Sequence, residues 1–164
     1  MEAYLHEPNT NGLTAFHLAI LYGHFFLLNY YMTLPGIDNY LSNDENSYDT
    51  LKVACRVGNI GLFKLLSKYI KNWLYTGKDS YTILHYACGS EYIQIYNEVI
   101  NKCKEFVNKA PDTPLHWAVS NQRIAIVKKL ITIEGLELDI QNNVRVFVKL
   151  EWTYSSICGY SERV

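Results

Sequence analysis

The stretch "TPLHWA" at residues 113–118 decides the fold, because variants of it recur along the chain. Upstream copies read "TAFHLA" ending at Ala19, "DTLKVA" ending at Ala54 and "TILHYA" ending at Ala87. Successive copies are therefore 35, 33 and 31 residues apart. Self-similarity at a period of roughly 20–50 residues predicts stacked structural repeats.

An apolar stripe follows the closing alanine of each copy at helical spacing. Positions six, eight, nine and twelve residues beyond the alanine are apolar in sixteen of sixteen cases, where chance would supply roughly half. Such spacing predicts an amphipathic helix with one buried face. Each unit should thus hold a short first helix, a turn and a longer second helix. Gly23-His24 and Gly58-Asn59 mark two of these turns, since glycine readily takes positive φ after a helix.

A mean period of 33 residues, in which T-P-L-H-x-A opens the first helix, resembles the ankyrin repeat. The resemblance covers residues 9 to 143 and implies an all-α ankyrin-repeat solenoid of four helix-turn-helix repeats with connecting hairpin loops. Polar segments between the repeats, such as 35–47, are predicted to be extended loops or hairpin tips. The expected repeats span about 9–43, 44–76, 77–107 and 108–138, followed by the start of a fifth at 139–143.

The recurring motif residues are predicted to be structural. Thr113 can cap the first helix, and Pro114 is tolerated in its first turn, where no amide partner is lost. In this family the motif histidine is implied to hydrogen-bond the backbone and the neighbouring threonine, which favours a structural role over a catalytic one. The motif positions are Thr14, His17, Ala19, Thr82, His85, Ala87, Thr113, Pro114, Leu115, His116 and Ala118.

Three repeats depart from the pattern. In the second, Asp49 and Lys52 replace the threonine and the histidine, and their spacing predicts an i, i+3 ion pair. The third and fourth carry Glu91-Tyr92 and Gln122-Arg123 where the first two have glycine. A side chain at a left-handed position costs about 1 kcal/mol, so these turns are either strained or reshaped.

The first repeat is unusually apolar, with no charged residue from Pro8 to Ile37. The run imitates a membrane span of roughly 20 residues, but Gly23-His24 and the lack of a flanking basic cluster favour two short helices. Terminal repeats normally present a polar outer face. Either another element or the segment 1–7 is therefore expected to cover Phe25, Phe26, Tyr30 and Tyr31.

The C-terminal segment 144–164 does not continue the repeat and is treated as a non-repeat tail. Apolar residues alternate with others over 144–150, which fits a short edge strand. A disordered tail and the stump of a longer array are the other interpretations, and we favour the stump.

Composition restricts the possible functions. Fifteen basic residues balance sixteen acidic ones without a block of like charge, which argues against nucleic acid or membrane surfaces as partners. No nucleophile elbow, phosphate-binding loop or zinc-protease motif is present, so no enzyme activity, cofactor, metal or small-molecule substrate is predicted. Four cysteines without a CxxC pair, and no glycosylation sequon, favour an intracellular, cytoplasmic location.

The predicted function is non-catalytic binding of a protein partner through the concave face and loop tips. The alternatives are a fragment of a larger signalling, channel or enzyme protein, and an assembly role in which the first repeat stacks on another chain. The principal partner-binding candidates are Tyr22, Tyr48, Arg56, Lys78, Tyr81 and Asp112. The wider set of contact positions adds Thr10, Asn11, Leu13, Leu21, Glu45, Asn46, Val57, Asp79, Gly89, Ser90, Lys109, Ala110, Ser120 and Asn121.

Overall fold

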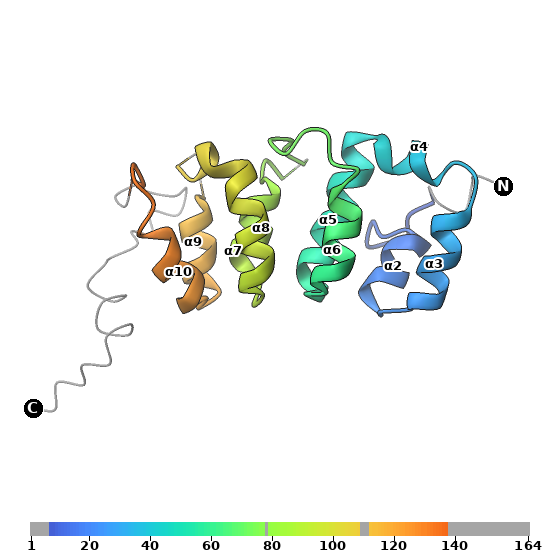
Figure 1. The fold of residues 1–164 in the computed structure, drawn as a ribbon, viewed down its shortest axis with the longest axis horizontal. Coiled ribbons are helices and arrows are strands. Elements are labelled where there is room, and N and C mark those ends of the chain that lie inside the picture. Colours follow the sequence, from blue (N-terminus) through green and yellow to red (C-terminus); the bar gives the residue numbers. More distant parts are fainter. Residues whose placement is uncertain (1–6, 78, 109–111, 138–164) are drawn as a thin grey trace, which may run out of the picture. The chain divides into compact units, whose positions relative to one another are not determined.

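The computed structural model describes residues 7–77, 79–108 and 112–137 (Figure 1). Across these ranges the chain folds into nine α-helices and one short 3-10 helix, and no β-strand occurs in them. The chain divides into two compact units, Met1–Ile83 and Leu84–Val164. The all-α fold class predicted from the repeats is confirmed.

The first unit contains two helix pairs. Helices α2 (Ala15–Leu21) and α3 (Phe25–Thr33) form the first pair, and α5 (Asp44–Val57) and α6 (Ile60–Ser67) form the second. Helix α2 also packs against α5, which joins the two pairs. The apolar run that imitates a membrane span is divided at Gly23, where φ is 66°, as the sequence predicted. Fully buried side chains include Phe16, Ile20, Leu51 and Phe63.

The second unit contains the helices of the third and fourth repeats. Its elements are α7 (Ile83–Gly89, which begins at the boundary), α8 (Ile93–Cys103), the 3-10 helix η1 (Lys104–Phe106), α9 (Pro114–Ser120) and α10 (Ile124–Leu130). Helix α10 packs against both α9 and α8. The apolar stripe supplies much of the core, with Ile95, Tyr96, Val99, Ile126, Val127 and Leu130 buried.

One stripe position departs from the prediction of a buried face. The residue six places beyond the alanine is the first residue of the second helix, and it lies at the edge of the core. Phe25 is 58% exposed there in the first repeat and Ile124 is 48% exposed in the fourth. Leu27, two residues further on, is also exposed.

The segment 35–47 was predicted to be an extended loop, and this is wrong. It forms helix α4 (Ile37–Ser42) and the first turn of α5. Ile37, Tyr40 and Leu41 are buried, so α4 has its own apolar face at i, i+3, i+4 spacing. The side chain of Asn43 then accepts hydrogen bonds from two amides of the next turn, which starts α5 at once.

The two turns without glycine have different backbone conformations. Gln122 keeps the left-handed conformation with φ of 58° despite its side chain. Glu91 does not adopt positive φ, and Ser90 reshapes the third turn by donating its hydroxyl to the Ala87 carbonyl. Arg123 joins the turns, because its guanidinium binds the Gly89 carbonyl at 2.9 Å and the Glu91 carboxylate at 3.0 Å.

Several predictions fall on residues outside the described ranges. These are the start of a fifth repeat at 139–143, the strand or tail at 144–164, and the contact positions Lys78, Lys109 and Ala110.

Candidate functional site

Threonine–histidine pairs hold the starts of the first helices. In α2 the Thr14 hydroxyl accepts the His17 amide at 3.3 Å, and the His17 ring Nδ1 accepts the Thr14 amide at 3.2 Å. Thr113 and His116 form the same reciprocal cap at α9. Because Nδ1 is an acceptor in both pairs, the neutral ring carries its proton on Nε2.

The second ring nitrogen links one repeat to the next. His17 Nε2 lies 3.2 Å from the Thr50 hydroxyl, and His85 Nε2 donates to the Asp112 carbonyl at 2.9 Å. Burial lowers the pKa of His17, although the nearby Asp49 carboxylate partly opposes this. Both nitrogens of His17 are therefore engaged by the fold, and the ring is kept neutral.

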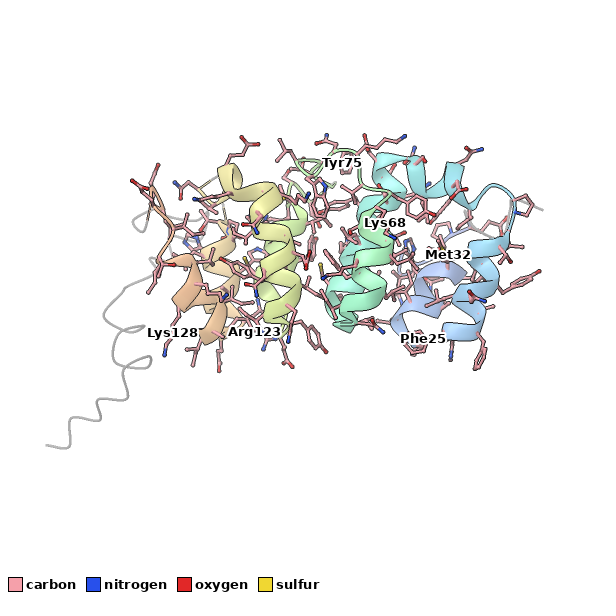
Figure 2. All side chains as sticks on the ribbon, viewed as in Figure 1. Phe25, Met32, Lys68, Tyr75, Arg123 and Lys128 are labelled. Carbon is pink, nitrogen blue, oxygen red and sulfur yellow. The ribbon has the colours of Figure 1, made fainter. Side chains whose placement is uncertain are left out.

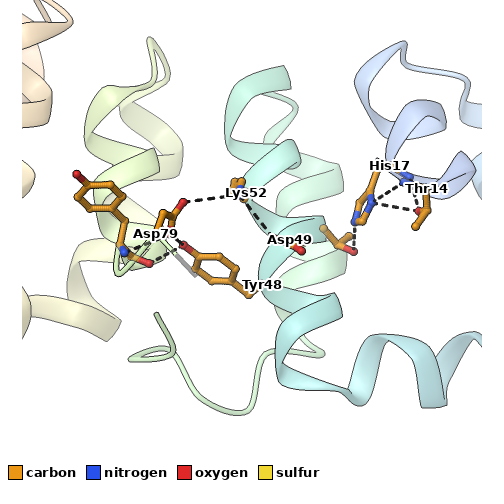
Figure 3. A network of polar contacts seen from close by, with 8 residues as sticks. Thr14, His17, Tyr48, Asp49, Lys52 and Asp79 are labelled. Carbon is orange, nitrogen blue, oxygen red and sulfur yellow. Dashed lines mark hydrogen bonds and ion pairs between the residues drawn. The ribbon is translucent and has the colours of Figure 1, made fainter. Parts of the chain in front are cut away.

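Lys52 replaces the histidine in the second repeat and makes a different link (Figure 3). Its ammonium lies 3.6 Å from the Asp49 carboxylate, so the predicted i, i+3 pair is present. It also lies 3.8 Å from Asp79 in the following repeat and 5.8 Å from the centre of the Tyr48 ring. An ion pair thus joins the second repeat to the third.

Tyr48 makes the backbone hydrogen bond that a motif histidine makes elsewhere. Its hydroxyl donates to the Tyr81 carbonyl, just as His85 donates to the Asp112 carbonyl. Tyr81 and Asp112 occupy equivalent places, each immediately before the motif threonine. The tyrosine therefore compensates for the lysine in the histidine position.

Tyr48 is consequently not the exposed contact residue that the sequence predicted. It is only 2% exposed, and its ring packs edge-on against Tyr75 with 5.4 Å between centroids. A Cβ atom on Gly77 would lie 2.5 Å from the Tyr48 ring, so only glycine fits beside it. The prediction failed because α5 already begins at Asp44, which turns Tyr48 inward instead of placing it on a loop tip.

A groove of about 820 Å³ lies in the first unit among the 8–14 loop, α2, α5 and the loop ending at Asp79. We call it the α2–α5 groove. Lys52 and its two carboxylate partners, Asp49 and Asp79, form part of its wall, and Tyr40 and Tyr75 line it as well. The predicted contact positions that it brings together are Asn11, Leu13, Leu21, Glu45, Asn46, Tyr48, Arg56 and Asp79.

The principal candidates are distributed unevenly around this groove. Arg56 lines it, is exposed, and forms no ion pair within the described residues. Tyr22 is 68% exposed but is not among the lining residues, and Tyr81 is half-buried. Asp112 belongs to the second unit and is half-buried. Motif alignment missed Tyr40 and Tyr75, because neither occupies a repeating position.

Other kinds of site are not evident in the described part of the chain. No group of three or more His, Cys, Asp or Glu side chains there could hold a metal ion. Cys55, Cys88 and Cys103 are buried, and burial raises the pKa of each of the Cys55 and Cys103 thiols. None of the helices in the described ranges has the length and apolar character needed to cross a bilayer.

Comparison with known proteins agrees with this repeat geometry. The family model for ankyrin repeats, in three copies, matches residues 51–142, which is more than half of the chain. No curated protein matches the sequence. Helix α5 packs on α6 and α9 packs on α10, and threonine and histidine cap α9. The predicted longer second helix is wrong for these two pairs, because α5 has 14 residues against 8 in α6, and α9 and α10 have 7 each. The chain belongs to the ankyrin repeat family.

Proposed function

We propose that this protein binds a protein partner through the α2–α5 groove, with Arg56 as its main charged anchor. Ankyrin-repeat domains are in general protein–protein interaction modules and are typically non-catalytic. We assign this general role to one surface of the first unit, the α2–α5 groove. Its lining combines loop residues with the face of α5, the two places from which the resemblance implies partner contacts.

Arg56 is the observation that carries the proposal. The other basic residue of the groove, Lys52, lies within 4 Å of two carboxylates. Arg56 is exposed and has no such partner among the described residues. Arginine is enriched at interaction hot spots, and its planar guanidinium binds carboxylates in a bidentate way. The favoured partner is therefore a polypeptide with an acidic side chain beside apolar ones.

The rest of the groove gives that partner a preformed surface. The buried, hydrogen-bonded Tyr48 keeps the wall of the groove fixed, and the half-buried Leu13 and Leu21 contribute apolar area to the lining. A rigid surface loses little side-chain entropy on binding, which improves affinity for a given area. Loop tips supply further contacts at Asn11 and Asp79, and Tyr81, Tyr22, Lys78 and Asp112 remain predicted contacts.

Selection of binding peptides from a displayed random library tests this proposal. Peptides that bind the full chain should be enriched in Asp or Glu flanked by apolar residues. Arg56→Glu should weaken their binding by about 2 kcal/mol or more, roughly 30-fold in Kd by calorimetry. Lys128→Glu, an exposed basic residue on α10, is the matched control and should change Kd little. Peptides that bind Arg56→Glu as tightly as the unchanged protein would refute the site.

A second candidate function places these repeats in a larger signalling, channel or enzyme protein, where they serve assembly or regulation. The unusually apolar surface of the first repeat favours an assembly role. For location, the buried thiol of Cys55, which forms no disulfide within the described residues, supports a reducing intracellular compartment, such as the cytoplasm.

A further inference from the structure

The exposed side of helix α3 is the most apolar surface in the described part of the chain. Phe26 is 97% exposed, and nearby large apolar side chains are also open to solvent. We call this surface the α3 face and define it by Tyr22 (68% exposed), Phe25 (58%), Phe26 (97%), Leu27 (41%) and Tyr30 (59%). Tyr22 directly follows α2, and the other four residues belong to α3, where Phe26 and Tyr30 lie one turn apart on the exposed side and Phe25 and Leu27 flank them.

The area of the α3 face is large for a surface that meets only water. Taking about 200 Å² for a fully open aromatic side chain and somewhat less for leucine, the five side chains expose about 600 Å². The largest apolar patch of a typical monomer covers about 300–600 Å² and often has a function. Helices that are apolar on nearly every side are normally buried on every side. Helix α3 buries only Leu28 fully, and no residue in the described ranges covers its exposed side.

We propose that a second copy of this chain covers the α3 face, in a two-fold symmetric dimer. Complete burial of these side chains in both copies would remove at most about 1,200 Å² from water, which equals the lower limit of about 1,200–2,000 Å² for stable interfaces. In such a dimer each side chain meets its own counterpart or a close neighbour of it. A charged face would then oppose like charge, but no charged residue occurs between Pro8 and Ile37. The face is therefore electrically compatible with itself.

An apolar groove beside the face gives the opposing copy a place to pack. It has a volume of about 410 Å³ and lies between α3 and α6. Phe25 and Met32 line it from α3 (Figure 2), and Leu62, Leu65 and Leu66 line it from α6. Phe25 belongs to both surfaces, so the groove and the α3 face are continuous. Two-fold pairing lets each copy supply a ridge and receive one.

Sedimentation velocity of the full chain at about 1 to 200 µM, with a reducing agent to prevent cross-linking, measures this dimer directly by mass action. The unchanged protein should shift from monomer to dimer within that range. Phe26→Asp should raise the dimer dissociation constant at least about tenfold, because the interface would then contain two facing carboxylates. The Phe26 side chain is almost fully exposed in one copy, so far-UV circular dichroism should be unchanged.

Ile124→Asp is the matched control. Ile124 is also an exposed apolar residue in the first turn of a helix, and a carboxylate at either site interacts equally with that helix end. This variant should dimerise like the unchanged protein. A chain that stays monomeric over the whole concentration range overturns the proposal. A monomer that binds neutral lipid vesicles through the α3 face overturns it as well, and so does a monomer in which the N-terminal residues cover that face. Equal dimerisation of Phe26→Asp and Ile124→Asp also overturns it.

Discussion

Replacing Tyr48 with phenylalanine tests whether its hydroxyl takes the place of the absent motif histidine. The change removes one oxygen and leaves the packing against Tyr75 in place. It also removes one of two hydrogen bonds to the half-buried Tyr81 carbonyl, which still accepts the Gly77 amide at 3.4 Å. Loss of one intramolecular hydrogen bond costs about 0.5–1.5 kcal/mol, and we expect about 1 kcal/mol here. For a chain of this size the melting temperature should fall by about 2–4 °C.

Tyr75→Phe is the control for this experiment. Tyr75 is a half-buried tyrosine beside Tyr48, and its hydroxyl makes no hydrogen bond with the described residues. Its loss should cost less than about 0.5 kcal/mol. Thermal and urea unfolding followed by circular dichroism compare the two variants. Equal destabilisation by Tyr48→Phe and Tyr75→Phe would refute the reasoning.

A compensating substitution sharpens the same test. Lys52→His restores the motif histidine, whose counterpart in the third repeat, His85, donates to the Asp112 carbonyl. In the Tyr48→Phe background it should recover part of the lost stability, although it also removes the contacts of Lys52 with Asp49 and Asp79. In the unchanged protein it should bring no gain, because Tyr48 already occupies the Tyr81 carbonyl. The four proteins form a double-mutant cycle, and additivity within about 0.3 kcal/mol would show that the two residues do not share a role.

Three further predictions concern folding stability. Gly77→Ala should destabilise the protein by more than about 1 kcal/mol in urea, because its Cβ would overlap the Tyr48 ring, whereas Gly61→Ala in α6 should not destabilise it. The pKa of His17 is lowered from 6.5 in the folded state, so the unfolded chain binds the proton more readily, and stability should fall as the pH drops below about 6.5. His17→Gln should flatten this dependence between pH 7 and 5, while His24→Gln at an exposed site should leave it intact. Leu115→Asp buries an unpaired charge in α9 and should cost at least about 3 kcal/mol, with loss of α10 helicity as well, whereas Ile124→Asp at the surface should be nearly neutral. If α10 stays folded in Leu115→Asp, the two helices do not share a core.

The sequence predicted features that depend on repetition. The helix pairs, the break at Gly23 and the reciprocal Thr113–His116 cap all follow from a motif and an apolar stripe that recur at a fixed period. Each of these features forms from residues that lie within a single repeat. The Asp49–Lys52 pair was predictable for the same reason, since its spacing lies within one helical turn.

Features that depend on tertiary contacts were not predictable. Helix α4 and the early start of α5 come from Asn43 and a short apolar face, in a segment whose polar composition resembles a loop. Tyr48 was misplaced because its exposure depends on that early start. The Lys52–Asp79 contact joins residues 27 positions apart, and the motif carries no information about it. Of the groove, the sequence identified Arg56 and the loop tips but not Tyr40 and Tyr75.

The lysine in the second repeat limits how this protein can be engineered. Repeats of this family are attractive as interchangeable parts, because each is held mainly by its neighbours. Here the second repeat relies on Gly77, Asp79 and the Tyr81 carbonyl, which all belong to the third. A chimaera that contains residues 44–76 alone would lack the Tyr81 carbonyl that accepts the Tyr48 hydrogen bond and the Asp79 carboxylate that contacts Lys52. The smallest portable piece of this chain therefore extends through residue 81.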